Sequence, residues 1–280
     1  MPIITPINWP APAKLNLFLH ITGRRPDGYH LLQTVFQFID YCDMLSFDVR
    51  DDGIIRRINE VKGIAPEADL VFRAARLLQQ TTGTTRGVEI HVEKHIPLGG
   101  GLGGGSSDAA TTLVALNRLW NTSLAQPELI KLGLQLGADV PVFIAGQAAW
   151  AEGVGEKLTP LILPEPWYLV IAPPCHVVTA AVFSNPELTR DCRPIRIENF
   201  LSGQGVNVCE PVVCKQYPPV AHALEWLAQF AMARMSGTGA CVFASFSDRD
   251  DADHVFEQLP AGWAGFIAKG LNRSPLFDGA

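Results

Sequence analysis

The chain has 280 residues, of which 48% are hydrophobic and 18% charged, and its formal net charge at pH 7 is −6. This length can hold one large or two smaller domains, and the composition is typical of a globular chain rather than a disordered one. The acidic balance, without Lys/Arg runs, argues against nucleic-acid binding, and no apolar run approaches the roughly 18 residues of a membrane span.

The cysteines and the first residues bear on the cellular compartment. The six cysteines show no CxxC spacing, which favours reduced thiols in a cytoplasmic protein, and a Cys209–Cys214 pair stays open as an alternative. Residues 1–6 have neither the basic start nor the apolar core of a signal peptide. We find no sequence feature that indicates an obligate protein partner.

The first half of the chain mixes strands and helices. Apolar runs and alternation predict strands over 15–21, 31–39, 44–49, 88–96 and 148–151. Helical spacing predicts helices over 69–80 and 126–136. The regular alternation of a doubly wound sheet is missing, so the pattern favours an α+β fold.

Three prolines between Pro160 and Pro166 interrupt the pattern and indicate a boundary, so we expect one domain over 1–160 and another over 161–280. Beyond them, the patterns predict the elements of a second domain: strand 168–172, helix 219–231, strand 241–246, helix 250–259 opened by Ser247, and strand 265–269. The β-α-β ending suits a ferredoxin-like domain.

The most informative segment is a glycine run. Six glycines within residues 99–105 lead into Ser106 and Ser107, and helical spacing follows. Glycine allows the backbone to fold around an anion, and a helix N-terminus behind it adds unpaired N–H donors. We expect a strand, a phosphate-binding loop and a helix capped by Ser106 or Ser107. A flexible linker, the alternative, would lack ordered flanks.

Three well-known phosphate loops do not fit these residues. A Walker loop needs a lysine after the glycines, and none follows here. A dinucleotide fingerprint needs a strand buried on both faces, whereas the strand before this loop carries Glu89, His91 and Glu93. A protein-kinase glycine loop joins two strands, but a helix follows this one.

The loop resembles the ATP motif of the GHMP kinases, a family that includes galactokinase, homoserine kinase and mevalonate kinase. The residues that carry this resemblance, and that it implies bind ATP, are Pro97, Leu98, Gly99, Gly100, Gly101, Leu102, Gly103, Gly104, Gly105, Ser106 and Ser107. Segments 12–17 and 235–241 resemble the first and third motifs of the family. Segments 25–30 and 136–141 resemble signatures of the branch whose acceptor is a cytidine diphosphate derivative. The resemblance runs in order from about Trp9 to Leu276.

The resemblance implies a two-domain GHMP kinase fold, with an N-terminal α+β nucleotide-binding domain and a C-terminal ferredoxin-like domain. It implies in-line transfer from ATP, with Mg²⁺, to a small-molecule hydroxyl, with Asp139 as the catalytic base and Lys14 assisting. By residue type alone, Asp139 is equally compatible with a turn or helix cap, and Lys14 with an outward-facing strand residue.

The same resemblance implies a substrate pocket with a cytidine site. Tyr29 and His30 match its aromatic and histidine positions, Phe183 its opposite stacking wall, and Asn16 and Thr179 further polar contacts, together with Asp139. From its type alone, an isolated Phe such as Phe183 is more often a core residue than a stacking platform. The motifs leave two other functions open: a different GHMP kinase, such as a mevalonate or homoserine kinase, and a non-catalytic nucleotide-binding protein.

The sequence offers no separate metal site. His91 and His95, four residues apart on a predicted strand, would lie about 13 Å apart, too far to share one ion. Mg²⁺ takes few protein ligands, and Ser107 and Asp108 are possible contacts. Asp108 stands where many relatives carry Asn, and we expect it either to cap the helix or to lie near the cation.

Overall fold

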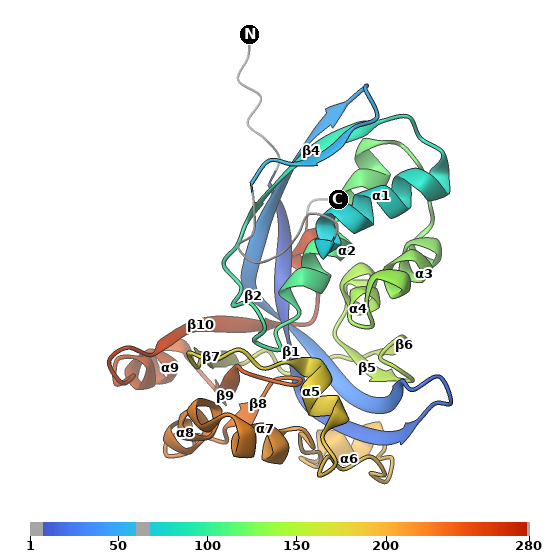
Figure 1. The fold of residues 1–280 in the computed structure, drawn as a ribbon. Helices are drawn as coiled ribbons and strands as arrows, with labels where there is room; N and C mark the ends of the chain where they lie inside the picture. Colours follow the sequence, from blue (N-terminus) through green and yellow to red (C-terminus); the bar gives the residue numbers. More distant parts are fainter. Residues whose placement is uncertain (1–7, 60–67, 279–280) are drawn as a thin grey trace.

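The computed structural model describes residues 8–59 and 68–278, so the N-terminal residues for which no targeting segment is predicted lie outside the described ranges. Figure 1 shows two lobes, one built mainly from the first half of the chain and one mainly from the second half. The strands β1 (Trp9–Arg24) and β2 (His30–Arg50) run through both lobes as an antiparallel pair. Among the described residues, no helix is both long and apolar enough to cross a membrane.

The strand β2 corrects one sequence prediction. We expected two strands, over 31–39 and 44–49, but the structure has one strand of 21 residues. The register with β1 shifts between Ala13, paired with Ile39, and Pro12, paired with Cys42. A bulge therefore absorbs the polar interruption at Asp40, and the strand continues because neighbours pair with it further along.

The remaining elements of the first lobe form a sheet covered by helices. They are β3 (Ile55–Arg57), β4 (Gly87–Glu93), β5 (Ala149–Glu152), β6 (Lys157–Pro160), α1 (Leu70–Thr82), α2 (Gly104–Leu119), α3 (Gln126–Leu136) and α4 (Val140–Ala145). Figure 1 shows the four helices on one side of the long strands. Their apolar side chains share a core with β1, β2 and β4. The positions expected for β4, β5, α1 and α3 are confirmed to within three residues. The strand β1 begins at Trp9, six residues earlier than expected, and the sequence patterns do not predict β3, β6 or α4.

The starts of two helices differ from the sequence prediction. We expected Ser106 or Ser107 to cap α2, but this helix begins at Gly104, with Gly103 as N-cap at φ 75° and no side-chain cap. The left-handed Gly103 turns the chain into the helix earlier than expected, so both serines and Asp108 lie inside it, and Asp108 does not cap it either. The helix α9 (Arg249–Phe256) is capped by Asp248 rather than by the expected Ser247.

The second lobe has ferredoxin-like topology. Its strands β7 (Trp167–Ala172), β8 (Arg234–Met235), β9 (Val242–Phe246) and β10 (Ala264–Leu271) pair antiparallel in the order β10-β7-β9-β8. The helices α5 (Thr179–Ser184), α6 (Ile197–Leu201), α7 (Glu210–Gln216) and α8 (Pro218–Leu227) lie between β7 and β8, and a short 3₁₀ turn, η2 (Pro275–Phe277), follows β10. The order matches a β-α-β-β-α-β unit with α9 as its second crossover.

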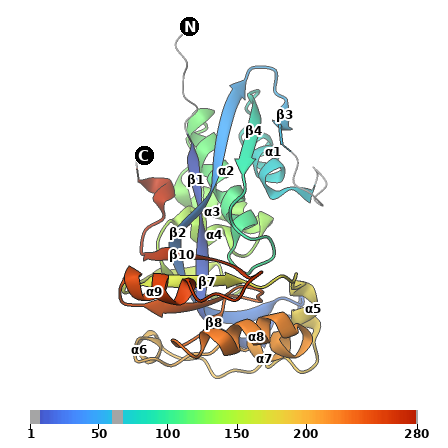
Figure 2. The ribbon, with the colours of Figure 1, turned by 90° about the vertical axis from the view of Figure 1, so that its left-hand side faces the viewer.

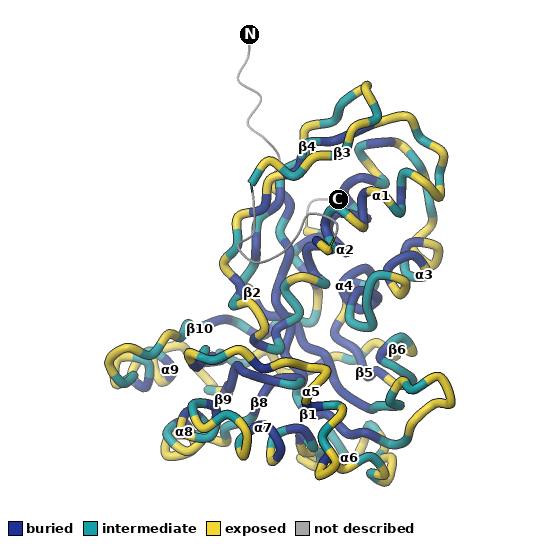
Figure 3. Tube along the Cα trace, viewed as in Figure 1, coloured by how far each residue is buried: buried dark blue, intermediate teal, exposed yellow. Residues whose placement is uncertain are grey.

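The two lobes share one sheet. Among the described residues, the ten strands connect into a single sheet, because Gly270 and Leu271 of β10 pair with Ile39 and Phe38 of β2. Figures 1 and 2 place α7 and α8 on the side of β8 and β9 that faces away from the first lobe. Buried residues follow the long strands from one lobe into the other (Figure 3). The expected division at residue 160 falls between β6 and β7 and stays a prediction.

Candidate active site

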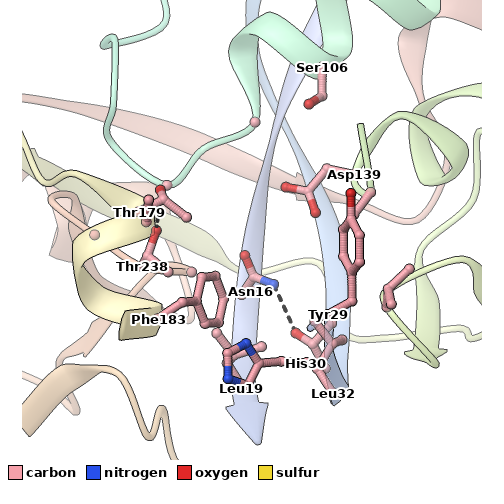
Figure 4. Close-up of a pocket in the computed structure, with 18 of the residues that line it drawn as sticks. Asn16, Leu19, Tyr29, His30, Leu32, Ser106, Asp139, Thr179, Phe183 and Thr238 are labelled. Carbon is pink, nitrogen blue, oxygen red and sulfur yellow. Dashed lines mark hydrogen bonds between the residues drawn. The ribbon is translucent and has the colours of Figure 1, made fainter. Parts of the chain in front are cut away.

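A cavity of about 900 Å³ opens where the glycine loop, β1, β2 and α5 meet (Figure 4). It therefore draws its walls from both lobes. Many of the residues that the sequence predicts for a site line this cavity: Lys14, Asn16, Tyr29, His30, Gly99, Gly101, Gly103, Ser106, Asp139, Thr179 and Phe183. The predicted loop residues that do not line it are Pro97, Leu98, Gly100, Leu102, Gly104, Gly105 and Ser107.

Lys14 and Asp139 meet on the cavity wall. Lys14 comes from the middle of β1 and is only 2% exposed, whereas Asp139 precedes α4 and is about half-buried. Lys14 Nζ lies 3.3 Å from Asp139 Oδ2. Asp139 is the N-cap of α4 by position, yet its side chain caps nothing, so its carboxylate is directed to the lysine and the cavity. The structure thus brings together the two residues predicted to be catalytic.

A buried polar network orients Lys14. Its Nζ donates to Asn16 Oδ1 at 2.5 Å and to the Gly101 carbonyl at 3.0 Å. Asn16 in turn donates from Nδ2 to Thr34 Oγ1 at 2.9 Å. The ammonium also lies 5.3 Å from the centre of the Phe36 ring. These contacts hold the lysine side chain in place, and because Asn16, the Gly101 carbonyl and the Phe36 ring are neutral, Asp139 is the anionic group beside its ammonium.

The glycine loop needs glycine at specific positions. Gly99, Gly101 and Gly103 have φ between 67° and 75°, a left-handed conformation that other residues adopt only with strain. A Cβ on Gly101 would lie 2.1 Å from the Ser236 carbonyl oxygen, and one on Gly103 would lie 2.8 Å from Phe143 and 3.0 Å from Lys14 Cε. The loop can therefore pack against the lysine only because these residues lack side chains.

The segment before β9 clamps the loop from the other lobe. Ala240 N donates to the Gly99 carbonyl at 3.1 Å, and Cys241 N donates to the Gly100 carbonyl at 3.0 Å. The Ser236 hydroxyl donates to the Gly101 carbonyl at 2.9 Å and accepts from Asn16 N at 3.1 Å. The N-terminal and C-terminal motif segments, more than 200 residues apart in the chain, thus hold the loop between them.

Aromatic side chains form the other end of the cavity. Figure 4 shows Tyr29 and Phe183 on opposite sides, with His30 between and below them. The His30 and Phe183 rings stack, with centroids 5.1 Å apart and planes 20° apart. A third ring does not fit between rings at that distance, so a flat ligand would have to lie on the Tyr29 side. Tyr29 is 63% exposed and offers a free ring face.

The environment of His30 favours a neutral imidazole. Burial lowers the pKa of His30, and the positive charges of Arg190 and Arg24 lower it further. Arg190 also donates from Nε to His30 Nε2 at 3.3 Å. A neutral imidazole has one donor and one acceptor nitrogen, which suits recognition of a polar ring edge.

The remaining predicted residues take different places. Thr179, at the start of α5, shares a hydrogen bond of 2.9 Å with Thr238 across the cavity rim. Ser107 is buried beneath the loop, and its hydroxyl has no partner among the described residues. Asp108 is also buried, and its Oδ2 accepts from Lys94 at 2.7 Å. Ser106 is thus the serine of the pair that reaches the cavity.

The acidic and histidine residues do not form a metal centre of their own. Across residues 8–59 and 68–278, no group of three or more His, Cys, Asp or Glu side chains is arranged to hold an ion. The six cysteines are all free thiols, including Cys209 and Cys214. Oxygen donors for a cation that arrives with a ligand are available on the cavity wall from Ser106 and Asp139.

Sequence reasoning missed several residues of the cavity. Ser236 and Thr238 lie in the segment that resembles the third motif, so that motif offered a signal for them. Thr34, Phe36 and Arg190 carried no such signal, since each sits in a stretch that reads as ordinary strand or loop. Only the folded arrangement brings these residues to the site.

Two family models match this chain, one in each lobe. Residues 69–147 match the GHMP kinases N-terminal domain, and residues 188–265 match the GHMP kinases C-terminal domain. A 4-diphosphocytidyl-2-C-methyl-D-erythritol kinase of Nitrosococcus oceani is 61% identical over 270 residues, covering 96% of both chains. A homologue of the same name from Shewanella loihica is 59% identical over 269 residues, covering 96% of this chain and 95% of the homologue.

Solved structures extend the comparison to the fold. A 4-(cytidine 5'-diphospho)-2C-methyl-D-erythritol kinase superposes with a TM-score of 0.81 at 34% identity, covering 94% of this chain and 99% of that one. The mevalonate kinase of Methanococcus jannaschii superposes with a TM-score of 0.70 at 16% identity, covering 97% and 100%. The second likeness concerns the fold alone.

Proposed function

The chain belongs to the GHMP kinases and, within them, to the 4-diphosphocytidyl-2-C-methyl-D-erythritol kinases, and from this membership we propose how its cavity carries out the reaction. It is an ATP-dependent kinase of the methylerythritol phosphate pathway, which makes isoprenoid precursors. In the proposal, the cavity binds ATP at the glycine loop and the cytidine diphosphate acceptor at the aromatic end. The γ-phosphoryl group passes directly to the 2-hydroxyl of the acceptor.

Asp139 takes the proton of that hydroxyl, and Lys14 assists. Lys14 Nζ, 3.3 Å from Asp139 Oδ2, places a positive charge beside the carboxylate that accepts the proton and beside the attacking oxygen. Lys14 is held by Asn16 and by the Gly101 carbonyl, so its position is set before the substrates bind. The Lys14–Asp139 pair inside the shared cavity is the observation that carries this proposal.

The glycine loop and the N-terminus of α2 receive the phosphates of ATP. The loop offers backbone N–H groups and the positive end of a helix, which together stabilise the negative charge that phosphoryl transfer develops. Mg²⁺ would be held mainly by phosphate oxygens, with Ser106 and Asp139 as protein donors on the wall. When bound, the ion neutralises phosphate charge.

The acceptor binds through its base at the end opposite the glycine loop. The free face of Tyr29 allows a base to stack, and the neutral imidazole of His30, which itself stacks on Phe183, can read a polar edge. Asn16 and Thr179 also line the cavity, where they can contact the rest of the acceptor. No part of this scheme requires a protein partner.

An assay of ADP release tests the proposal. The enzyme is supplied with ATP and one of three acceptors: 4-diphosphocytidyl-2-C-methyl-D-erythritol, its uridine analogue or mevalonate. The cytidine compound should react best, because the uracil edge exchanges a donor for an acceptor and leaves a protein group unpaired. His30→Ala should raise the acceptor KM about tenfold and leave the ATP KM unchanged, on the scale of one lost base contact.

The matched control is His222→Ala, which removes an exposed histidine of α8 that does not line the cavity. It should keep wild-type constants. Equal use of the uridine analogue would remove cytosine recognition from the scheme. Turnover of mevalonate at comparable efficiency would indicate a different GHMP kinase, and no turnover with any acceptor would favour the non-catalytic alternative.

A further inference from the structure

Arg190 joins the two lobes at the aromatic end of the cavity. It follows α5 in the chain and is half-buried, and its guanidinium donates hydrogen bonds to several acceptors. Nε donates to His30 Nε2 at 3.3 Å, Nη1 donates to the Leu188 carbonyl at 3.0 Å, and Nη2 donates to the carbonyls of Phe183 and Asn185 at 2.9 and 2.7 Å. The side chain therefore ties the end of α5 to the start of β2.

We propose that Arg190 is a positioning residue of the acceptor site, which holds the stacked rings of His30 and Phe183 and selects the tautomer of His30. An arginine has donors only, so His30 Nε2 must accept its hydrogen bond. The proton of the neutral ring is then on Nδ1. This inference rests on the proposed function, in which a neutral His30 reads the base of the acceptor.

The geometry gives Arg190 more than a packing role. The backbone carbonyl of Phe183 accepts from the same guanidinium that donates to the His30 ring, so one rigid, planar group joins the His30 ring to the backbone that carries the Phe183 ring. Phe183 belongs to α5 and His30 to β2, and no backbone ladder pairs these elements. Direct contact between the two rings is limited to their stacking, which is weak, so the hydrogen bonds of Arg190 add a polar link between the segments that carry them.

The positive charge of Arg190 has a second effect, which is to lower the pKa of His30. The charged groups around His30 are Arg24 on β1 and Arg190 after α5, while Asp27 in the connecting turn is paired with Arg25 at 2.7 Å. Both arginines lower the pKa of His30. Removing Arg190 should raise that pKa, so at a given acidic pH more of the ring is protonated. A protonated ring has two donors, and Nε2 can no longer accept.

Kinetics of two variants separate position from charge. Arg190→Met removes both, so the acceptor KM should rise about tenfold, with kcat and the ATP KM within about twofold of wild type. As the pH is lowered, His30 of the variant should become protonated earlier than that of wild type, so the acceptor KM of the variant should begin to rise at a higher pH. Arg190→Lys keeps the positive charge but loses the planar guanidinium and its several hydrogen-bond donors, so the acceptor KM should rise. The pH at which this KM begins to rise on acidification should stay as in wild type.

The control variant is Arg193→Gln, which removes one positive charge from the same segment at an exposed position outside the cavity. It should leave the constants and the pH profile unchanged. Nitrogen NMR of the His30 ring, assigned by comparison with His30→Gln, provides a readout that does not depend on the acceptor. Wild type should show the Nδ1-protonated tautomer, and the titration should move upward in Arg190→Met.

The following results would overturn the positioning role of Arg190. A folded Arg190→Met variant with unchanged His30 titration and unchanged acceptor KM would overturn it, as would a thermal destabilisation with no change in either. If Arg190→Met does not fold, an unchanged acceptor KM in Arg190→Lys overturns the positioning role. Should wild type use the uridine analogue equally well, the proposed cytosine recognition fails, while the NMR measurement still decides whether Arg190 controls His30.

Discussion

At the scale of single residues, the pair of Lys14 and Asp139 shows how context determines chemistry. A lysine in an apolar strand and an aspartate before a helix are both common and mostly structural. Here the lysine is buried, and three oxygen atoms from Asn16, Gly101 and Asp139 surround its ammonium group. The aspartate has a free edge toward the cavity.

Replacing Asp139 by Asn keeps the size of the side chain and removes its basicity. We expect kcat to fall by about a hundredfold or more, the scale of general base catalysis, while calorimetric binding of ATP and acceptor stays near wild type. Lys14→Met should show a similar loss of kcat. Turnover close to wild type in the Asp139→Asn variant would exclude this carboxylate as the base.

Asp108 leads to a prediction about the pH dependence of stability, because it is a buried carboxylate whose ionised form lowers the stability of the folded chain. Its Oδ2 is bound by Lys94, but its Oδ1 has no partner among the described residues. Burial raises the pKa of Asp108 to about 7; Lys94 opposes this shift, whereas the nearby Asp43 adds to it. A carboxyl whose pKa is higher in the folded chain holds its proton more tightly there, so folding is favoured at low pH.

The raised pKa of Asp108 predicts how the stability of the Asp108→Asn variant, relative to wild type, depends on pH. The stability contributed by the proton should be lost as the pH rises from about 4 to about 7. The variant lacks this titration, so its thermal midpoint relative to wild type should increase over that range and then level off. Scanning calorimetry of the ligand-free protein at several pH values measures this. A midpoint difference that does not vary with pH would contradict it.

At the scale of elements, the glycine loop is shaped by what surrounds it as much as by its own backbone. Three left-handed glycines make the turn possible. The loop then rests against Lys14 and Phe143 on one side and against the Ser236 segment on the other. A side chain added to it would cause both backbone strain and a steric clash.

Gly103→Ala should therefore lower stability by more than the backbone strain alone, because a steric clash adds to that strain. Its Cβ would meet Phe143 at 2.8 Å and Lys14 at 3.0 Å, so we expect a raised ATP KM together with a lower thermal midpoint. Gly83→Ala is the matched control, since Gly83 has a similar φ of 68° with nothing within 4 Å. It should lose only about 1–2 kcal/mol of stability and keep its ATP KM. Equal ATP constants in both variants would argue against the phosphate cradle.

At the scale of the whole molecule, the site exists only because the two lobes are joined. The sheet continues from β2 into β10, and Tyr168 of the second lobe donates from its hydroxyl to Gln37 Oε1 of the first at 2.6 Å. Ser236 closes the junction beside the cavity through Asn16 and Gly101. The contacts that join the lobes thus also hold the walls of the cavity in place.

Ser236→Ala should weaken this junction. It leaves the buried Asn16 N–H without its acceptor, which costs about 1–3 kcal/mol and should lower the midpoint of chemical unfolding. The Gly101 carbonyl keeps its bond from Lys14, so the loop should remain in place. Ser245→Ala, at an exposed position of β9, is the control and should change the midpoint little. A loss no greater than that of Ser245→Ala would show that the junction does not depend on this hydroxyl.

Sequence alone determined the features that local chemistry controls. The glycine run, the apolar periods of α1 and α3 and the β-α-β ending follow from backbone freedom and from spacing, which act over a few residues. The family, and with it the α+β two-domain fold and the kinase activity, followed from ordered motifs. These motifs also named the residues that line much of the cavity, such as Lys14, Asp139 and His30.

Tertiary structure decided the rest, because it depends on contacts between distant segments. Pairing with several neighbours carries β2 through a bulge where the sequence suggests two strands. Burial of Ser107 and Asp108 directs Ser106 to the cavity instead. Ser236 and Arg190 reach the site from the other lobe, more than 150 residues along the chain from Asn16 and His30. No period or spacing in one segment encodes such a meeting, since it is determined by how whole sheets and helices pack.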